Sequence, residues 1–259
     1  MARVRIDQLL VERGLAPSRA KAQALVLAGQ VVAGEARVDK PGQLVPAGVA
    51  VRLKEGATLR YVSRGGLKLE GALDRFGVDP AGLVCADLGA STGGFTDCLL
   101  QRGAARVHAC DVGRGQLDPK VANDPRVRVH DRMNVRAVGP EDLGESVDLC
   151  TADLSFISLR LVLPAIRAIL RPGGTLVALV KPQFEAGPEK VEKGGVVRDP
   201  AARAEAIEAV VAAARATGFD VVGTMDAPIR GPAGNLEALL VATRPARAMP
   251  RTPAPPGSS

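Results

Sequence analysis

Segments of strand length alternate with helical segments from Leu83 onward, and this alternation constrains the fold more than any other feature of the sequence. The apolar pattern predicts strands at 84–88, 106–111, 127–129, 147–152, 175–180, 220–227 and 235–242. Helices are expected over 68–76, after Gly94, after Ser158 and over 201–217. Alternation of this kind is typical of an α/β fold with a doubly wound sheet and helices on both faces.

The first of these strands leads into a glycine loop, CADLGASTGGFTD, which is followed by a helix. Glycines permit a tight turn and a close approach of the backbone to a ligand, and the helix N-terminus offers free N–H groups. No G-K-[ST] follows, so we do not expect a nucleoside triphosphate. The next strand ends in Asp111, 22 residues after Gly89, where a carboxylate can bind ribose hydroxyls. The pattern predicts a nucleoside-bearing cofactor, with plain turn glycines as the alternative.

The stretch D-L-G-A-S-T-G-G-F resembles the S-adenosylmethionine loop of FtsJ-like methyltransferases. The last two predicted strands, joined by APIRGPAGN, also suit the seven-stranded Rossmann-like methyltransferase sheet, in which a final hairpin makes one strand antiparallel. The resemblance implies S-adenosyl-L-methionine as the cofactor, with its adenine near Asn134, where a simple loop role is an equal alternative. The implied cofactor-binding residues are Asp87, Gly89, Ser91, Thr92, Gly93, Phe95, Asp111, Asn134 and Asp153.

The positive charge of the chain is concentrated in its first quarter. Residues 1–60 hold ten Lys and Arg against five Asp and Glu, whereas the remaining residues hold 24 against 23. This imbalance is expected of a segment that meets a polyanion. Arg3, Arg5, Arg19 and Lys21 lie near the starts of two short predicted helices, where they could grip phosphates. From charge alone, an ordinary solvated face explains them equally well.

The same segment resembles an RNA-binding module over about residues 3–53. Its motifs are R-x-D-x-L-L from Arg5, G-L-x-x-S-R from Gly14, G-x-V from Gly29 and K-P at Lys40. They are similar to the S4-like module of a small-subunit ribosomal protein, which pseudouridine synthases and tyrosyl-tRNA synthetases share. The resemblance implies a small α+β RNA-binding domain. The residues proposed to contact RNA are Arg3, Arg5, Arg19 and Lys21.

Ionisable residues stand at or near three predicted strand ends: Asp153 in TADLSF, Lys181 in LVALVKPQF and Glu237 in GNLEAL. Lys68, in SRGGLKLEGAL, begins the helix that precedes the first strand. The carboxyl ends of parallel strands border the crevice in which doubly wound proteins bind ligands. We therefore expect the four side chains to converge, with separate surface salt bridges as the alternative.

These four residues occupy the places of the K-D-K-E tetrad of FtsJ-like ribose 2′-O-methyltransferases. Together with VSRGGLKL, DLSFISL and VKPQFEAG…GGVVRDP, they make residues 3–243 similar to the TlyA family. The resemblance implies an enzyme that methylates a cytidine ribose in ribosomal RNA, of the large subunit and in some members also of the small one. It also implies that Lys68, Asp153, Lys181 and Glu237 are catalytic. Members of the family have also been called hemolysins.

The residue types fit this chemistry. A ribose 2′-hydroxyl is a poor nucleophile until its proton is removed, and a sulfonium methyl is open to direct displacement, so a base and good alignment suffice. The two histidines lie in ordinary contexts, which leaves lysine as the base: Lys181, with Lys68 beside it and Asp153 and Glu237 holding the pair. No metal is required.

Three other functions are weighed against this prediction. A membrane-active hemolysin would need an apolar or amphipathic insertion segment, and the sequence shows none. A catalytically inactive rRNA-binding factor would have a broken tetrad or cofactor loop, and both are intact. An N6-adenine methyltransferase would carry D-P-P-Y or N-P-P-Y after the fourth strand, where this chain has DLSF.

The domain prediction combines these resemblances. We predict an S4-like domain at 1–58, a linker at 59–64, an FtsJ-like methyltransferase domain at 65–244 and a disordered tail, rich in proline and serine, at 245–259. No apolar run approaches the roughly 20 residues of a membrane-spanning helix, and the start has no signal-peptide pattern, so a cytoplasmic protein without membrane contact is expected. The four dispersed cysteines are expected to be buried free thiols.

Overall fold

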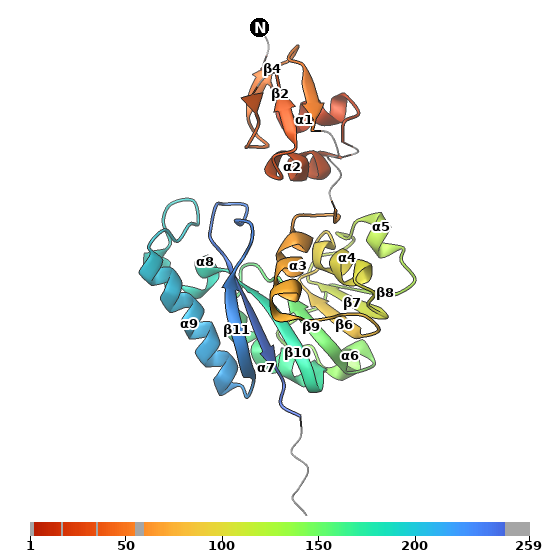
Figure 1. Cartoon of the computed structure of the whole chain (residues 1–259), viewed down its shortest axis with the longest axis vertical. Helices are drawn as coiled ribbons and strands as arrows, with labels where there is room; N and C mark the ends of the chain where they lie inside the picture. Colours follow the sequence, from red (N-terminus) through yellow and green to blue (C-terminus); the bar gives the residue numbers. More distant parts are fainter. Residues whose placement is uncertain (1–2, 17, 35, 55–59, 247–259) are drawn as a thin grey trace, which may run out of the picture.

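A computed structural model describes residues 3–16, 18–34, 36–54 and 60–246 of the chain. A small N-terminal part lies above one edge of a larger α/β part (Figure 1). Residues 60–64 of the predicted linker belong to the described residues. Nearly all of the predicted tail at 245–259 lies outside them.

Two helices and two small sheets form the N-terminal part. They are α1 (Ile6–Glu12), α2 (Arg19–Leu27), β1 (Arg3–Arg5) paired with β4 (Leu44–Pro46), and β2 (Val31–Ala33) between β3 (Ala36–Arg37) and β5 (Val51–Leu53). The Ser18 hydroxyl caps α2 by accepting the Lys21 N–H at 3.3 Å. Gly29, with φ of +67°, lets the chain turn from α2 into β2. Ile6, Leu10 and Val26 are fully buried between the helices and the sheets.

Seven strands form one sheet in the larger part. They are β6 (Val84–Leu88), β7 (Arg106–Asp111), β8 (Val127–Asp131), β9 (Val147–Ala152), β10 (Leu170–Val180), β11 (Asp220–Asp226) and β12 (Ala238–Thr243). Their order across the sheet is β11-β12-β10-β9-β6-β7-β8. β12 runs antiparallel to β10 and β11, while the remaining pairs are parallel. The predicted doubly wound sheet with an antiparallel strand in the final hairpin is confirmed.

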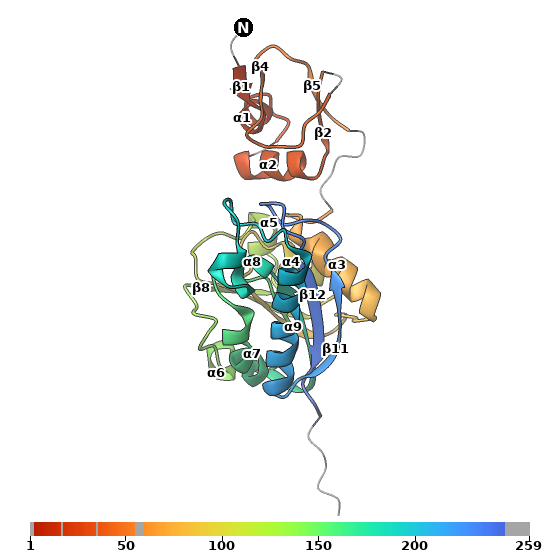
Figure 2. The same cartoon turned by 90° about the vertical axis from the view of Figure 1, so that its left-hand side faces the viewer.

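Helices cover both faces of this sheet. They are α3 (Gly65–Phe76), α4 (Gly94–Gln101), α5 (Pro119–Ala122), α6 (Pro140–Leu143), η1 (Leu159–Leu161), α7 (Leu163–Ile169), α8 (Pro182–Glu185), η2 (Pro188–Lys190) and α9 (Pro200–Ala216). Apolar residues of α3 and α4 belong to one buried cluster, and those of α7 and α9 belong to another. Figure 2 shows α3 and α9 on opposite sides of β11 and β12.

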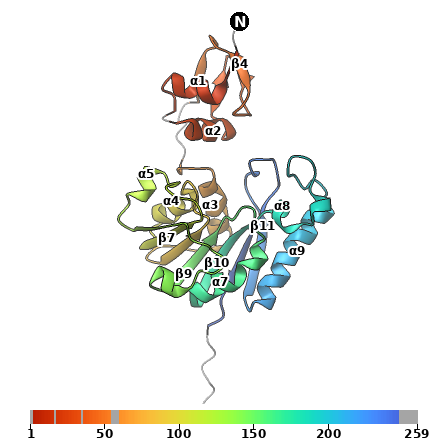
Figure 3. The ribbon, with the colours of Figure 1, turned by 180° about the vertical axis from the view of Figure 1, so that it is seen from behind.

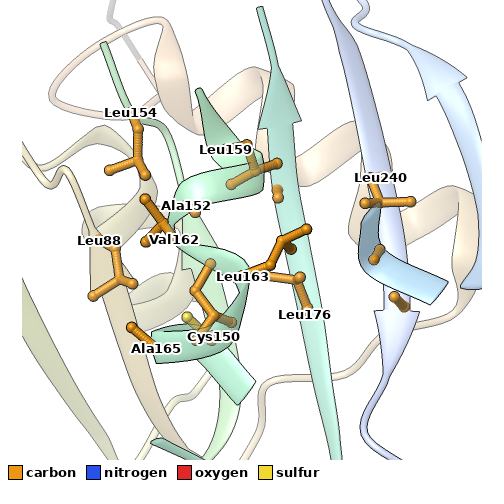
Figure 4. Packing of buried hydrophobic residues seen from close by; sticks show 14 of the residues in the cluster. Leu88, Cys150, Ala152, Leu154, Leu159, Val162, Leu163, Ala165, Leu176 and Leu240 are labelled. Carbon is orange, nitrogen blue, oxygen red and sulfur yellow. The ribbon is translucent and has the colours of Figure 1, made fainter. Parts of the chain in front are cut away.

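The cluster under α7 is a close-packed aliphatic layer. Leu159, Val162 and Leu163 lie over Cys150 of β9 and Leu176 of β10, and all five are at most 3% exposed (Figure 4). Full burial of a leucine-sized side chain stabilises a fold by roughly 1.5–3 kcal/mol. Residues 159–163, which follow the loop after β9, are therefore anchored to the sheet by their own apolar side chains.

Two strands differ from the prediction at their first residues. β10 begins at Leu170, because Leu170 already pairs with Val147 before a shift in register at Thr175. β12 begins only at Ala238, because Asn235 is drawn into a loop contact. The buried Asn235 side chain accepts the Val197 N–H at 2.9 Å and donates to a backbone carbonyl at residue 195, which joins the two loops next to the sheet.

The sheet edge that faces the N-terminal part holds the carboxyl ends of the parallel strands (Figures 1 and 3). Since β12 is antiparallel, it starts at this same edge, and Ala238 pairs with Val180. Lys181 follows β10 and Glu237 precedes β12 as a result, so the strand order brings both residues to one place. Convergence of the strand-end residues was the central expectation from the sequence.

Candidate active site

A cavity of about 450 Å³ lies at the carboxyl ends of β6, β7 and β9. Five residues predicted to bind a cofactor line it: Gly89, Ser91, Asp111, Asn134 and Asp153. The sequence did not single out the remaining lining residues, which are Val112, Gln116, Met133, Val135, Arg136, Leu154, Ser155, Phe156 and Ile157. Most of these directly follow β7, β8 or β9, so their position after a strand was the only available signal.

The glycine loop forms part of the wall of this cavity. Gly89 has φ of +82°, and a Cβ atom there would lie 2.6 Å from the Asp153 carbonyl oxygen. Gly93 has φ of +90°, and its Cβ would lie 3.0 Å from Leu117 and 3.1 Å from Val121. Both positions therefore require glycine for conformation and for space. The plain-turn alternative does not account for the tight contact of Gly89 with the segment after β9.

Asp111, the last residue of β7, lies beside the glycine loop. Its carboxylate accepts the Ser91 N–H at 2.8 Å and the Gly113 N–H at 2.7 Å, and it remains half-buried at the cavity wall. Each carboxylate oxygen has two lone pairs, so both can still accept hydrogen bonds from a ligand. The residues present thus fit a nucleoside with ribose hydroxyls.

Asp87 supports the loop from below and does not line the cavity. It is fully buried, and it accepts hydrogen bonds from the Thr96 hydroxyl at 2.6 Å and the Thr151 hydroxyl at 3.1 Å. Burial raises the pKa of its carboxyl to about 7. Gly93 also lies outside the lining, and Thr92 and Phe95 line an adjoining cavity instead.

The predicted tetrad residues converge as two ion pairs. Lys68 Nζ lies 2.5 Å from Glu237 Oε2, and Lys181 Nζ lies 2.6 Å from Asp153 Oδ1. The Lys181 ammonium also donates to the Ser155 hydroxyl at 2.9 Å. The side chains of the first pair are at most 7% exposed, whereas Lys181 and Asp153 are 12% and 23% exposed. The second pair is thus the more accessible one.

An open cavity of about 410 Å³ adjoins the first cavity and is lined by Lys68, Lys181 and Asp153. Arg64, which precedes α3, also lines it and is half-buried. Burial lowers the pKa of the Arg64 guanidinium, and the Glu237 carboxylate opposes this shift. Arg64 and Ser155 were not assigned from the sequence, although the quoted motifs VSRGG and DLSF contain them.

The predicted RNA-contacting residues of the N-terminal part do not all lie together. Arg5 and Arg19 both bind the carboxylate of Asp7, at 2.9 Å and 3.1 Å. Asp7 is fully buried, and the Arg5 guanidinium holds its pKa well below the usual range. Arg3 donates instead to the Leu44 carbonyl, and the Lys21 ammonium lies 3.4 Å from the carbonyl of residue 62. Asp7 is the acid of the R-x-D motif, and its place in that motif was the only signal for it in the sequence.

Other polar clusters of the described residues do not resemble a metal centre. All four cysteines are buried and free, as predicted. Within residues 3–16, 18–34, 36–54 and 60–246, no group of three His, Cys, Asp or Glu side chains could hold a metal ion. None of the helices in these ranges is long and apolar enough to cross a membrane.

Comparison with known proteins identifies the family. A model of FtsJ-like methyltransferases matches residues 61–244, and a model of the S4 domain matches residues 4–51. The 16S/23S rRNA (cytidine-2′-O)-methyltransferase TlyA of Mycobacterium tuberculosis is 48% identical over 238 residues, which cover 92% of this chain and 89% of the relative. The chain belongs to the TlyA family. It is therefore an S-adenosylmethionine-dependent methyltransferase with an S4 domain.

Solved structures agree with the TlyA family assignment. A Streptococcus thermophilus protein that has been assigned as a hemolysin is 44% identical, with a TM-score of 0.74, and the match covers 97% of this chain and 93% of that one. An S-adenosylmethionine-dependent methyltransferase of Mesorhizobium loti is 17% identical with a TM-score of 0.52, covers 68% of this chain and 98% of its own, and supports the fold alone. Both resemblances seen in the sequence, to the S4 module and to FtsJ-like enzymes, are confirmed.

Proposed function

We propose that the chain transfers the methyl group of S-adenosylmethionine to the 2′-hydroxyl of a cytidine ribose in ribosomal RNA. The TlyA relative is named for this reaction. The observation that carries the proposal is the position of Lys181, whose nitrogen contacts Asp153 and Ser155. Both contacted residues line the cavity of about 450 Å³, in which the cofactor would lie, and also the open cavity beside it. A base at that boundary lies where a methyl donor and an incoming hydroxyl would meet.

The four tetrad residues have separate roles in this proposal. When bound, S-adenosylmethionine supplies an electrophilic methyl group on a positively charged sulfur. Lys181, in its neutral form, accepts the proton of the ribose hydroxyl at Nζ, and Asp153 fixes the direction of that nitrogen. Lys68 adds a second amino group to the wall of the open cavity, and Glu237 neutralises its charge and holds it there. This set of roles requires alignment and a base, and no metal ion.

In this proposal the N-terminal part binds the RNA. We propose that residues 1–58 bind rRNA and residues 65–244 transfer the methyl group, with 59–64 as the linker. The Arg5 and Arg19 side chains remain 43% and 57% exposed although Asp7 holds them, so both can still contact phosphates. Since the substrate is part of the ribosome, the proposal includes a cytoplasmic location.

Single-turnover methylation of rRNA with tritiated S-adenosylmethionine tests the proposal. We expect label in alkali-resistant cytidine dinucleotides, because a 2′-O-methyl group blocks hydrolysis of the adjacent phosphodiester. Lys181→Ala should lower the rate by about 100-fold to 10,000-fold, as for other positioned bases. Lys181→Arg should fail almost as badly, since a guanidinium stays protonated.

Lys193→Ala is the matched control, because this lysine is exposed and lies outside both cavities. It should keep the wild-type rate. Label in the base would reject a ribose substrate. Near-full activity of Lys181→Arg would show that Lys181 is an electrostatic support, and Lys68 would then be the next candidate for the base.

A further inference from the structure

Glu185 is a buried acid next to the active site that the proposed reaction does not use. It is the last residue of α8, four residues after Lys181, and it is 7% exposed. Its carboxylate accepts the Leu159 N–H at 2.6 Å, the Ser158 hydroxyl at 2.6 Å and the Arg160 Nε–H at 3.2 Å. Burial of a carboxylate is costly unless it is paired and hydrogen-bonded. All three of these bonds reach one short segment.

That segment, residues 153–160, comprises the loop after β9 and the first two residues of η1; we call it the β9 loop, and it carries Asp153 and Ser155. Three further contacts join it to α8 and its flanking lysine. Lys181 Nζ contacts Asp153 at 2.6 Å and Ser155 at 2.9 Å, and the Phe184 ring lies against the Phe156 ring with 5.3 Å between centroids. The β9 loop is therefore held at its beginning by Lys181 and at its end by Glu185.

The β9 loop has a conformation that needs such a restraint. Phe156 has φ of +64°, a left-handed conformation that is strained for any residue with a Cβ atom. The residue is 92% exposed, so burial of the ring does not compensate for the strain. Hydrogen bonds to an ionised carboxylate are roughly twice as strong as neutral ones, which makes Glu185 the principal restraint from α8.

We propose that Glu185 is a positioning residue for methyl transfer, whose carboxylate clamps the β9 loop onto α8 and so holds Asp153 and Ser155 in place around Lys181. The inference rests on the role proposed above for Lys181. Glu185 lines neither cavity, so it acts through the loop and touches neither substrate nor cofactor. Misplacement of a reacting group by about 1 Å can slow a reaction by about 100-fold, so a loosened loop should affect the rate more than the binding.

Glu185→Gln in the full-length chain tests this role, because glutamine keeps the length and the acceptor for Leu159 but loses the charge. We expect kcat for rRNA methylation to fall by about 10-fold to 100-fold, with the KM for S-adenosylmethionine changed by less than about threefold. Hydrogen exchange of the Leu159 amide should become faster. In a double-mutant cycle with Ser155→Ala, the combined loss should be smaller than the product of the two single losses, because both changes disturb the same placement.

Asp148→Asn is the matched control for a purely structural acid. Asp148 is 9% exposed, accepts the Val84 N–H at 2.8 Å and pairs with Arg171, but it lies near the start of β9, at the opposite edge of the sheet. Its variant should keep kcat per folded molecule. Equal losses for both variants, or independent effects of Glu185→Gln and Ser155→Ala, would overturn the inference.

Ser158→Ala covers the case in which Glu185→Gln does not fold, because it removes a donor to the same carboxylate from the loop side. It should lower kcat in the same direction, and a wild-type rate would count against the clamp. Failure of the proposed function can be told apart from failure of this inference. If the proposed function is wrong, the wild-type protein gives no 2′-O-methyl product. The hydrogen-exchange rate of the Leu159 amide still reports, in that case, whether Glu185 holds the loop.

Discussion

Removal of the Lys68 charge should destabilise the protein strongly, because it leaves a buried acid alone. In Lys68→Met, Glu237 keeps a carboxylate that is 0% exposed and whose Oε1 already has no hydrogen-bond partner among the described residues. At the observed separation of 2.5 Å and an effective dielectric constant of about 20, the lost attraction is about 6–7 kcal/mol. Desolvation of both ions opposes that attraction in the wild-type protein, so the pair itself contributes little net stability.

We expect Lys68→Met to lower the free energy of unfolding by about 3–5 kcal/mol, the usual result when one partner of a buried ion pair is removed. The melting temperature should fall by about 6–20 °C, since a domain of this size loses roughly 2–4 °C for each kcal/mol. Equilibrium urea unfolding, monitored by circular dichroism, measures the free energy directly. The double variant Lys68→Met/Glu237→Gln should recover part of the loss, because no unpaired charge remains.

Lys190→Met provides the control, because its partner Glu205 and Lys190 itself are both well exposed, at 66% and 40%. Exposed pairs contribute roughly 0–1 kcal/mol, so this variant should unfold close to the wild-type protein. A cost below about 1 kcal/mol for Lys68→Met, or no recovery in the double variant, would refute the reasoning. A small cost would mean that Glu237 finds another partner, such as the Arg64 guanidinium, on which its charge acts. A missing recovery would mean that the cost does not come from the unpaired carboxylate.

Three further predictions concern the cofactor loop, the RNA-binding face and the pH dependence of stability. Gly89→Ala should weaken S-adenosylmethionine binding at least about tenfold by calorimetry, because its Cβ would lie 2.6 Å from the Asp153 carbonyl oxygen; unchanged affinity would reject the glycine loop as part of the cofactor site. Asp7→Asn should weaken rRNA binding about threefold to tenfold in filter binding, with no change in cofactor affinity, because Arg5 and Arg19 lose the anion that orients them; equal affinity would show that they need no such support. Burial lowers the pKa of His108 and His130 from the ordinary 6.5. As the pH falls, the two imidazoles therefore become protonated at a higher pH in the unfolded chain than in the folded protein. The free energy of unfolding should therefore decrease below about pH 6.5, and a slope that persists in His108→Gln/His130→Gln would assign it to other groups.

Much of the α/β part could be predicted because strand and helix periodicities are local properties. The runs before Gly89, Asp111 and Asp153 are mainly apolar over the length of a strand, and the structure has strands there. The limits of β10 and β12 could not be predicted, since they depend on pairing with β9 and on a loop contact of Asn235. The local strand propensity of a segment does not depend on these distant contacts, so it cannot predict where β10 and β12 begin.

The candidate site shows the same division. Lys68 and Glu237, 169 residues apart, could be nominated from their places near a helix start and a strand end, but nothing in the spacing says that these two pair with each other. Asp87 and Asp111 stand at similar places in consecutive strands, yet one is buried under the loop and the other lines the cavity.

The class of fold, the S4-like and FtsJ-like resemblances, the glycine loop and the residues that meet at the sheet edge could all be recognised in the sequence. The folded chain was needed to show which acid neutralises which lysine, that Asp7 contacts two arginines and that Glu185 contacts the β9 loop. The difference lies in the range over which the interactions act. Backbone conformation and amphipathic patterning act over a few residues along the chain, whereas ion pairing and burial depend on which distant strands lie side by side. Here the antiparallel β12 brings Glu237 to the edge of the sheet where Lys181 follows β10.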